Sequence, residues 1–326
     1  MSVYNGARFL HEAIASVLAQ SFTNFEFLIL DDGSSDDSPE IIADFAKHDD
    51  RIRPIFRENR GLVASLNQLI DEARAPIIAR MDADDVCLQN RFAKQIAFLS
   101  ENPAYGVVGS WVDDIDEHSK LWPHQVAPLP TTHDQIINAI ETGDLLFCHS
   151  SVMYRRAVVL EVGGYNSMFR HCEDLNLWLS LANITRLANL PIKLLRYRRH
   201  TNQVSNVYST QQQVGAAIAR LAYHERKNER QDPTAALRSL PNIDDLDLLF
   251  GRVGTARDVR AKLAVGLQYS RTALVDTGLD IILHHVRDGG DRYGMWRTVA
   301  RLLRFGEPMK ALRLARALAQ INLKRK

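Results

Sequence analysis

The sequence predicts an α/β fold, with a mainly parallel sheet flanked by helices and a helical C-terminal region. Over residues 1–111, apolar runs of strand length alternate with segments whose apolar residues recur at helical spacing. Two of these runs end in acidic turns, at residues 31–37 and 82–85. From about residue 209 onward the spacing is almost entirely helical. Alternating strands and helices form βαβ units, and their strands lie parallel.

The elements of the first 111 residues follow from apolar spacing and turn chemistry. Leu10, Ile14 and Val17 lie on one face of a helix. Ser38 and Pro39 form a cap and a first-turn proline, so a helix begins there. The predicted order is helix 10–18, strand 25–30, helix 38–48, strand 52–56, helix 62–70, strand 76–81, helix 91–100 and strand 105–111.

Residues 112–205 are less regular. Three prolines between residues 121 and 132 predict a loop. We expect a strand over 151–154, a turn over 163–165, a helix with Leu175, Trp178 and Leu179 on one face, and a strand over 194–198. The pattern therefore predicts one domain over residues 1–205 and a helical region over residues 206–326.

Composition indicates a globular protein. The 326 residues are 46% hydrophobic and carry a net charge of +1, which gives no reason to expect nucleic-acid binding. No run approaches the length of a membrane helix, and Met1 to Gly6 lack the features of a signal peptide. The cysteines at 87, 148 and 172 are far apart, which favours reduced thiols. We expect a cytoplasmic protein.

The first predicted strand is short. Only Met1, Ser2 and Val3 precede the turn at residues 4–6, whereas a strand usually has about five or six residues. The true start lies upstream, or the chain has lost half of a core strand. We favour the first explanation.

Asp82-Ala83-Asp84-Asp85 is the most informative acidic turn, because it directly follows the apolar run 76–81. Two carboxylates at this spacing can hold Mg²⁺ or Mn²⁺ against a phosphate. The sequence has no G-x-G-x-x-G and no G-x-x-x-x-G-K-[ST] loop, so a diphosphate would need such a cation. Taken alone, the turn fits a solvated acidic loop better than a metal site.

Two further carboxylate pairs stand at element ends. Asp31 and Asp32 precede Gly33 in a tight turn, which either caps the next helix or aims a carboxylate at a base or ribose. Glu173 and Asp174 precede an apolar helical face and fit a helix cap or a general base. These last two roles are compatible, because a helix N-terminus keeps a carboxylate ionised.

Seven motifs, in this order, resemble the family-2 inverting glycosyltransferases of GT-A fold across residues 1–205. The motifs are Val3-Tyr4-Asn5-Gly6, Asp31-Asp32-Gly33-Ser34-Ser35-Asp36, Asn59-Arg60-Gly61-Leu62, Met81-Asp82-Ala83-Asp84-Asp85, Gly163-Gly164-Tyr165, Glu173-Asp174-Leu175-Asn176-Leu177-Trp178 and Tyr197-Arg198-Arg199-His200. The resemblance implies a Rossmann-like catalytic domain. Its nucleotide-sugar half would span about residues 1–111 and its acceptor half about residues 112–205.

The resemblance also implies roles for individual residues. Tyr4 would lie against the nucleotide base, and Asp32 would accept a hydrogen bond from it. Asp82 would lie near the ribose and the metal, and Asp84 would be the direct metal ligand. Asp174 would take the proton from the acceptor hydroxyl. The implied cofactors are Mg²⁺ or Mn²⁺ and a nucleotide-sugar donor, expected to be UDP-linked.

The histidines carry less signal. His149, His171 and His200 form no metal-ligand spacing, so each is expected to be an ordinary polar residue. Some relatives have a diphosphate or metal contact at the position of His200. Asp85 is left without a role.

The predicted function is transfer of a sugar from a nucleotide-diphosphate sugar to a hydroxyl of a glycan or lipid-linked acceptor. The alternatives are a metal-dependent phosphohydrolase or nucleotidyltransferase, and a non-catalytic nucleotide-binding scaffold. An aspartyl-phosphate hydrolase would carry Asp-x-Asp after its first strand, whereas here it follows the fourth strand-like segment. The short first strand keeps the scaffold alternative open.

The C-terminal 30 residues are basic, with a single acid, Glu307. A basic helical tail can lie on anionic lipid, so one expectation is peripheral contact with the inner face of the cell membrane. The other is a solvated helix packed on the catalytic domain. Leu314, Leu318 and Ile321 share one helical face, which Met309 and Leu312 do not join.

Overall fold

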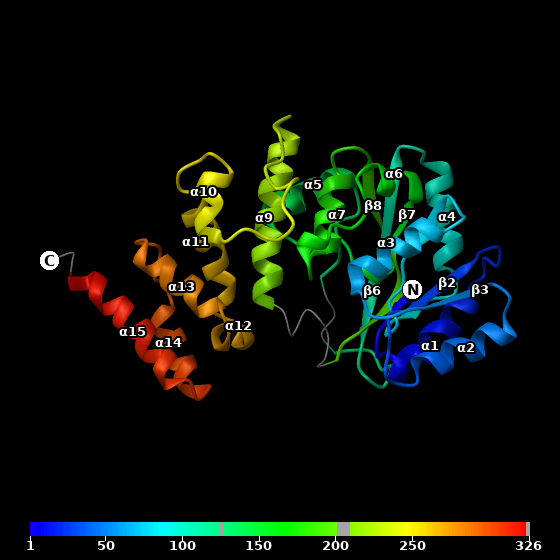
Figure 1. Ribbon diagram of the computed structural model, residues 1–326, viewed down its shortest axis with the longest axis horizontal. Coiled ribbons are helices and arrows are strands. Elements are labelled where there is room, and N and C mark those ends of the chain that lie inside the picture. Colours follow the sequence, from blue (N-terminus) through cyan, green and yellow to red (C-terminus); the bar gives the residue numbers. More distant parts are fainter. Residues whose placement is uncertain (124–126, 201–208, 324–326) are drawn as a thin grey trace. The chain divides into compact units, whose positions relative to one another are not determined.

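The computed structural model describes residues 1–123, 127–200 and 209–323, which form two compact units (Figure 1). The first unit comprises Met1–Ser167 and Glu173–Thr201, and the second comprises Met168–Cys172 and Asn202–Lys326. The boundary predicted between residues 205 and 206 lies outside the described residues.

Two sheets form the centre of the first unit. The first sheet has the order β1-β2-β3 and is parallel throughout, with β1 at Ser2–Val3, β2 at Phe27–Asp31 and β3 at Ile52–Phe56. The second has the order β4-β7-β6-β8-β5, with β4 at Ile77–Ala79, β5 at Val86–Cys87, β6 at Tyr105–Ile115, β7 at Met153–Arg155 and β8 at Arg186–Arg198. The α/β class and the short first strand are confirmed.

The second sheet is mixed rather than parallel. Only β6 and β8 run parallel, while β4 and β6 pair antiparallel with β7, and β5 pairs antiparallel with β8. Strands β6 and β8 are longer than their apolar runs predict, because they pair with one another from Tyr105 and Arg186 to Ile115 and Arg198. Parallel order therefore holds for the first sheet, whereas in the second sheet the internal strand β7 and the edge strand β5 run antiparallel to their neighbours.

Helices cover these sheets. They are α1 (Ala7–Leu18), α2 (Ser38–His48), α3 (Leu62–Glu72), α4 (Arg91–Glu101), α5 (His133–Thr142), α6 (Arg156–Glu161) and α7 (Glu173–Leu181). Helices α2 and α3 both contact β2, and Figure 1 shows α1 and α2 below β2 and β3 and α3 above them. Leu10, Ile14, Ile29 and Leu99 are fully buried in the core that these elements share. The predicted helices at 10–18, 38–48, 62–70 and 91–100 are confirmed.

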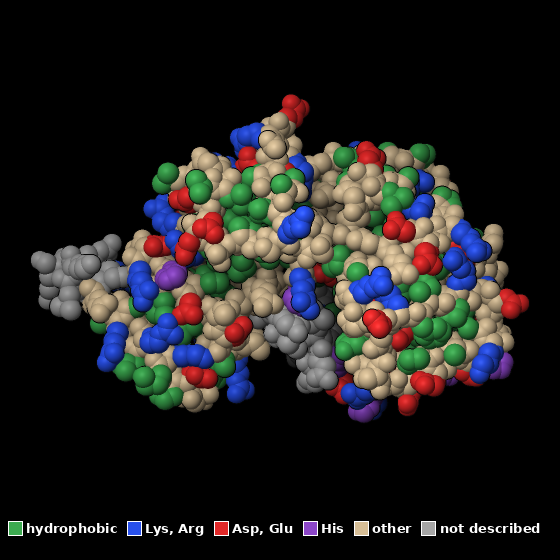
Figure 2. All heavy atoms as spheres, viewed as in Figure 1, with side chains coloured by type: hydrophobic (Ala, Val, Ile, Leu, Met, Phe, Trp, Pro, Cys, Tyr) green, Lys and Arg blue, Asp and Glu red, His purple; other side chains and the backbone are tan. Residues whose placement is uncertain are grey.

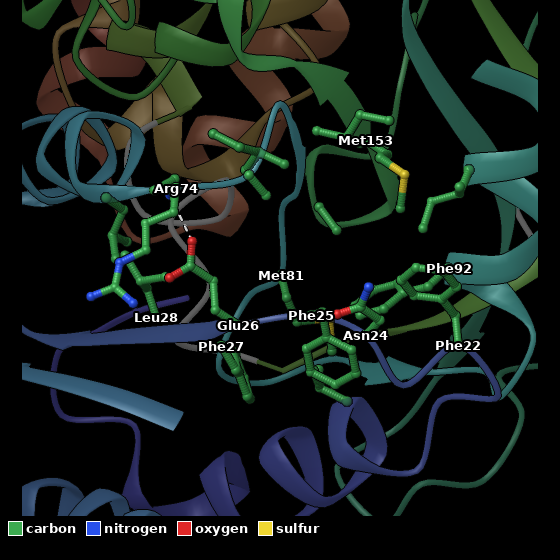
Figure 3. A pocket seen from close by; sticks show the side chains of 18 of the residues that line it. Phe22, Asn24, Phe25, Glu26, Phe27, Leu28, Arg74, Met81, Phe92 and Met153 are labelled. Atoms are coloured by element: carbon green, nitrogen blue, oxygen red, sulfur yellow. Dashed lines mark hydrogen bonds between the residues drawn. The ribbon is translucent and has the colours of Figure 1, made fainter. Parts of the chain in front are cut away.

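An apolar cavity of about 520 Å³ lies between β2 and β4, the strands of the two sheets that border the gap beside the short β1. Figure 3 shows Phe22, Phe25 and Phe92 around one end and Glu26 and Arg74 at the other. The cavity follows from the length of β1, since a two-residue strand cannot join β2 to β4 along their whole length.

The second unit is helical where it is described. Its helices are α9 (Ser209–Lys227), α10 (Leu246–Leu249), α11 (Thr255–Leu267), α12 (Arg271–Val275), α13 (Gly278–Arg287), α14 (Met295–Arg304) and α15 (Pro308–Leu323). Helix α13 contacts α11, α12 and α15, and α14 contacts α15. Among the described residues, no helix combines the length and the hydropathy that crossing a bilayer requires.

Candidate active site

Asp82, Asp84 and Asp85 form a cluster of carboxylates just after β4. One carboxylate oxygen from each lies within 4.8 Å of the others. Asp82 and Asp84 are partly exposed, whereas Asp85 is buried. Gly6 lies against this turn, because a Cβ built on it would meet Ala83 Cβ at 3.4 Å. The end of β1 and the predicted metal-binding turn are therefore neighbours.

Asp82 is fixed from two sides. Its backbone N–H donates to Ser150 Oγ at 2.9 Å, and its carboxylate forms an ion pair with Arg80. The Arg80 side chain is only 6% exposed. Burial and the neighbouring Asp84 raise the pKa of Asp82, and the Arg80 charge opposes them. The buried arginine thus stabilises the negative charge of the partly exposed Asp82.

Asp84 lies beside His200. The Nε2 atom of His200 is 3.0 Å from Asp84 Oδ2, so the ring sets the direction of that carboxylate. His200 therefore lies beside the predicted metal ligand Asp84.

Asp85 anchors the turn from beneath. Its Oδ1 accepts the backbone N–H of Arg198 at 2.8 Å, while its Oδ2 is buried without a hydrogen-bond partner in the described structure. Burial, and then the charges of Asp84 and Asp82, raise the pKa of Asp85 well above its usual range. A buried orphan carboxylate oxygen facing two further carboxylates fits a cation.

Arg198 holds the same turn through its side chain. Its guanidinium donates to the Asp84 carbonyl at 2.7 Å, to Glu12 Oε2 of α1 at 2.7 Å and to the Asp116 carbonyl at 3.0 Å. The side chain is 1% exposed. Nothing in the local sequence around Arg198 reveals these partners.

The donor set is compatible with Mg²⁺ or Mn²⁺. It consists of hard carboxylate oxygens, two of them partly exposed, and Arg198 and His200 orient the turn that carries them. Asp84 and Asp82 would hold such an ion, and Asp85 would support them. The assignment of the metal to this turn remains a prediction.

In the acidic turn after β2, the carboxylates of Asp31 and Asp32 have different hydrogen-bond partners. Asp32 accepts Arg57 Nε at 2.9 Å, the Arg60 N–H at 3.0 Å and the Gly61 N–H at 2.8 Å. Asp31 accepts two N–H groups of its own turn through Oδ2, and its buried Oδ1 has no partner in the described part of the chain. Asp31 is thus a candidate for contact with the nucleotide base. The sequence alone does not show which of the neighbouring acids Asp31 and Asp32 has this role.

Tyr4 is presented by a bound turn. Asn5 adopts a left-handed φ of 51°, and its side chain accepts the Ser35 N–H at 2.8 Å. The Asn5 N–H donates to Ser34 Oγ at 2.8 Å. These bonds tie the turn at residues 4–6 to the acidic turn after β2 and leave Tyr4 58% exposed. An exposed ring beside a polar turn can stack on a planar ligand.

Asp174 stands in the first turn of α7, where the helix dipole favours a negative charge. Burial raises the pKa of Asp174, whereas the Leu175 N–H at 2.7 Å and the charge of Arg80 lower it. The charge of Asp82 also reaches Asp174. Arg80 and Asp82 therefore influence the charge state of Asp174, although it lies about ninety residues further along the chain.

In this region the ring of His149 contacts two other aromatic side chains, those of Tyr165 and Trp178. His149 Nε2 is 2.8 Å from Tyr165 Oη, and the His149 ring packs edge-on against Trp178. Burial, helped by the Arg80 charge, lowers the pKa of His149 well below its usual range, so the ring is neutral. The expectation for His149 is an ordinary polar residue, and in the structure it makes a partly buried contact with Tyr165.

Comparison with known proteins bears on the same region. A model of the family "Glycosyl transferase family 2" matches residues 1–163. EpsE of Bacillus subtilis, which carries a glycosyltransferase name, is 37% identical over 183 residues, covering 55% of this chain and 64% of EpsE. The O-antigen biosynthesis glycosyltransferase WbnJ of Escherichia coli is 31% identical over 206 residues, covering 61% of this chain and 78% of WbnJ. The match thus spans just under two thirds of EpsE.

Two groups of solved structures share the GT-A fold. S. aureus TarS 1-349 in complex with UDP has a TM-score of 0.54 at 15% identity, covering 79% of each chain. The mannosyltransferase PcManGT from Pyrobaculum calidifontis, in complex with GDP-Man and Mn²⁺, has a TM-score of 0.51 at 16% identity, covering 98% of this chain and 85% of that one. These likenesses support the fold, while the family model spans half of the sequence. The chain belongs to glycosyl transferase family 2.

Proposed function

We propose that this protein is an inverting glycosyltransferase, which moves a sugar from a nucleotide-diphosphate donor to a hydroxyl of a glycan or lipid-linked acceptor. The observation that carries the proposal is the cluster of three carboxylates after β4, one of which forms an ion pair with the buried Arg80. The charges of Arg80 and Asp82 also act on Asp174. Activation of the acceptor needs a carboxylate base, and stabilisation of the leaving diphosphate needs ligands for a cation. Asp174 would supply the first, and the carboxylates after β4 would supply the second.

Asp84 and Asp82 are proposed to hold the divalent cation. When bound, the cation would offset the negative charge that develops on the leaving diphosphate. His200 would keep Asp84 oriented, and Arg80 would keep Asp82 ionised. TarS is described with UDP and PcManGT with GDP-Man, so the base of this chain's donor is open. We propose a UDP-linked donor, with Tyr4 and the turn of Asp31 and Asp32 on its base side. Because the Asp32 carboxylate already accepts three hydrogen bonds, Asp31 would be the acid that contacts the base.

Asp174 is the proposed general base. In one displacement, a bond forms between the acceptor oxygen and the anomeric carbon while the bond from that carbon to the diphosphate oxygen breaks, so the configuration inverts. The acceptor proton passes to the Asp174 carboxylate. Burial raises the pKa of this carboxylate, which makes it a stronger base, and its place at the start of α7 keeps it ionised.

The acceptor is proposed to be a growing surface glycan or its lipid-linked precursor. WbnJ, by its name, acts in O-antigen biosynthesis. A lipid-linked acceptor would place the enzyme at the inner face of the cell membrane.

Release of nucleoside diphosphate from UDP- and GDP-sugars in the presence of Mn²⁺ tests the proposal. We expect release that depends on Mn²⁺, and a product of inverted anomeric configuration by NMR. Asp174→Asn should keep Mn²⁺-dependent donor binding and lose turnover by roughly 10²–10⁴-fold. Asp44→Asn, a change on the exposed side of α2, is the matched control and should keep both. Full turnover in Asp174→Asn, or retention of configuration, would refute the assignment.

A further inference from the structure

Helix α14 has an exposed face that combines apolar and basic residues. The residues of α14 that are buried within the second unit are Met295, Thr298 and Leu302. On the opposite side, Trp296 and Leu303 are each 56% exposed. These two residues lie seven positions apart, so they share one helical face. Arg297 and Arg304 are exposed beside them.

Helix α15 repeats this arrangement. Leu314 and Leu318 are buried, while Met309 and Leu312 are 70% and 42% exposed. The exposed Arg313 and Arg316 lie on the same side as Met309 and Leu312 by helical spacing. The helix therefore has two apolar faces, one packed on the second unit and one in solvent. This explains why Met309 and Leu312 do not join the face of Leu314 and Leu318.

The charge on these helices is strongly positive. Residues 295–320 contain a single acid, Glu307, which pairs with Lys310 at 3.3 Å. Arg313 pairs with Asp280 at 2.7 Å. In the described chain no ion pair is formed by three other basic side chains, Arg297, Arg304 and Arg316. Figure 2 shows basic and hydrophobic side chains next to one another over α14 and α15, at the lower left.

An anionic bilayer is the surface that satisfies both kinds of side chain. Tryptophan and leucine enter the boundary between headgroups and acyl chains, while arginines bind the lipid phosphates. A nucleic acid would use the arginines but leave Leu303, Met309 and Leu312 in water. If the partner were an acidic protein, this protein would not bind vesicles of anionic lipid.

We propose that the exposed face of α14 and α15, which we call the basic–apolar face, binds anionic phospholipid bilayers. The face is formed by Trp296, Arg297, Leu303, Arg304, Met309, Leu312, Arg313 and Arg316. The inference deepens the proposed function, since it names the surface that would hold the enzyme near a lipid-linked acceptor. It requires no role for Asp84 or Asp174.

Vesicle sedimentation of the full chain tests this proposal. Vesicles of phosphatidylcholine alone are compared with vesicles that also contain phosphatidylglycerol. We expect binding to the second kind only, weakening as salt rises. The charge variant Arg297→Gln/Arg304→Gln/Arg316→Gln and the apolar variant Trp296→Ser/Leu303→Ser should each lower the bound fraction several-fold.

The matched control is Arg238→Gln/Arg257→Gln/Lys262→Gln, which removes the same charge from exposed positions elsewhere in the second unit. It should bind as the wild type does. Equal loss in this control, equal binding to both kinds of vesicle, or an apolar variant that binds normally would each overturn the proposal. A thermal midpoint equal to that of the wild type shows that each variant is folded. Donor hydrolysis measured without vesicles reports the transferase proposal separately.

Discussion

His200 Nε2 lies 3.0 Å from Oδ2 of Asp84, although 116 positions separate them in the chain. The contact joins the end of the five-stranded sheet, just after β8, to the acidic turn after β4. A carboxylate that is already oriented loses less freedom when it binds a cation. The pair therefore links the architecture of the sheet to the proposed metal site.

Asp84→Asn should abolish the effect of Mn²⁺ while leaving the fold intact. The change removes a charged ligand, and losing transition-state charge stabilisation of this kind costs roughly 10²–10³-fold in turnover. Thermal shift with Mn²⁺ and donor, together with nucleoside diphosphate release, measures both effects. His200→Gln should weaken the metal response by a smaller factor. A thermal shift by Mn²⁺ in Asp84→Asn equal to that of the wild type would show that the ion binds elsewhere.

Arg80→Met should destabilise the fold by about 1–3 kcal/mol, because it leaves the partly exposed Asp82 charge without its buried partner. Urea unfolding measures the change. The double variant Arg80→Met/Asp82→Asn should recover part of the loss, since it removes the unpaired charge as well. Arg53→Met is the control, because the Arg53 side chain is 31% exposed, against 6% for Arg80, and its pairs with Glu26 and Glu72 should each contribute less than about 1 kcal/mol. Equal losses in the two arginine variants would contradict the assignment.

Much of the first unit could be predicted because its signals are local. The bounds of α2 coincide with the prediction from Ser38 to His48, and Pro39 stands in its first turn as expected. The predicted cap is wrong, because Asp37 is the N-cap residue, its side chain forms no capping hydrogen bond, and Ser38 is already helical. Helix α5 also carries local signals, a capping box between Thr132 and Gln135 and a left-handed Gly143, but the proline-rich segment before it hid them. The mixed second sheet could not be predicted, because its pairings join distant segments such as residues 77–79 and 153–155.

The candidate site divides in the same way. The carboxylates at 82, 84 and 85 are visible because their spacing is local. The role of Asp85 depends on Arg198, 113 positions away, and the role of Arg80 depends on its burial. Neither partnership leaves a periodic signal in one sequence. The nucleotide-side roles of Tyr4 and Asp32 remain predictions.

Because of His149, the free energy of unfolding should decrease as the pH falls into the mildly acidic range. Burial lowers the pKa of His149 well below its usual range, so the folded protein keeps the ring neutral beside Tyr165 Oη. The unfolded chain takes up the proton below about pH 6.5. The stability linked to His149 is therefore complete above that pH and is lost as the pH falls below it.

Urea unfolding between about pH 7.5 and pH 5.5 measures this effect, which amounts to at most about 1.4 kcal/mol per pH unit. His149→Gln should flatten the dependence. His48→Gln serves as the control, because His48 is exposed on α2 and pairs only with its own helix. If His149→Gln keeps the wild-type slope, the pH dependence arises from other groups.

Extending β1 at its N-terminus should stabilise the first unit. The Met1 amino group donates to the Leu28 carbonyl at 2.8 Å, and burial lowers its pKa to about 5. Parallel strands alternate the side to which each residue bonds, so the Leu28 N–H points into the cavity between β2 and β4. On the far side, Pro76 and Arg80 bond toward β7, which directs the peptide groups of Ile77 and Ala79 into the same cavity.

A designed extension of four β-branched residues before Met1 should therefore pair with both strands and fill the cavity. Each strand hydrogen bond adds about 0.5–1.5 kcal/mol, and the buried amino group becomes a peptide. The amino group binds its proton less tightly in the folded chain, so the stability of the unextended chain falls as the pH drops from about 8 to 5, by about 1.4 kcal/mol per pKa unit. The extension should raise the thermal midpoint and remove this dependence. A Gly-Ser extension of equal length is the control, because it also replaces the amino group at Met1 by a peptide but has little tendency to form a strand. If both extensions raise the midpoint equally, no strand forms in the cavity.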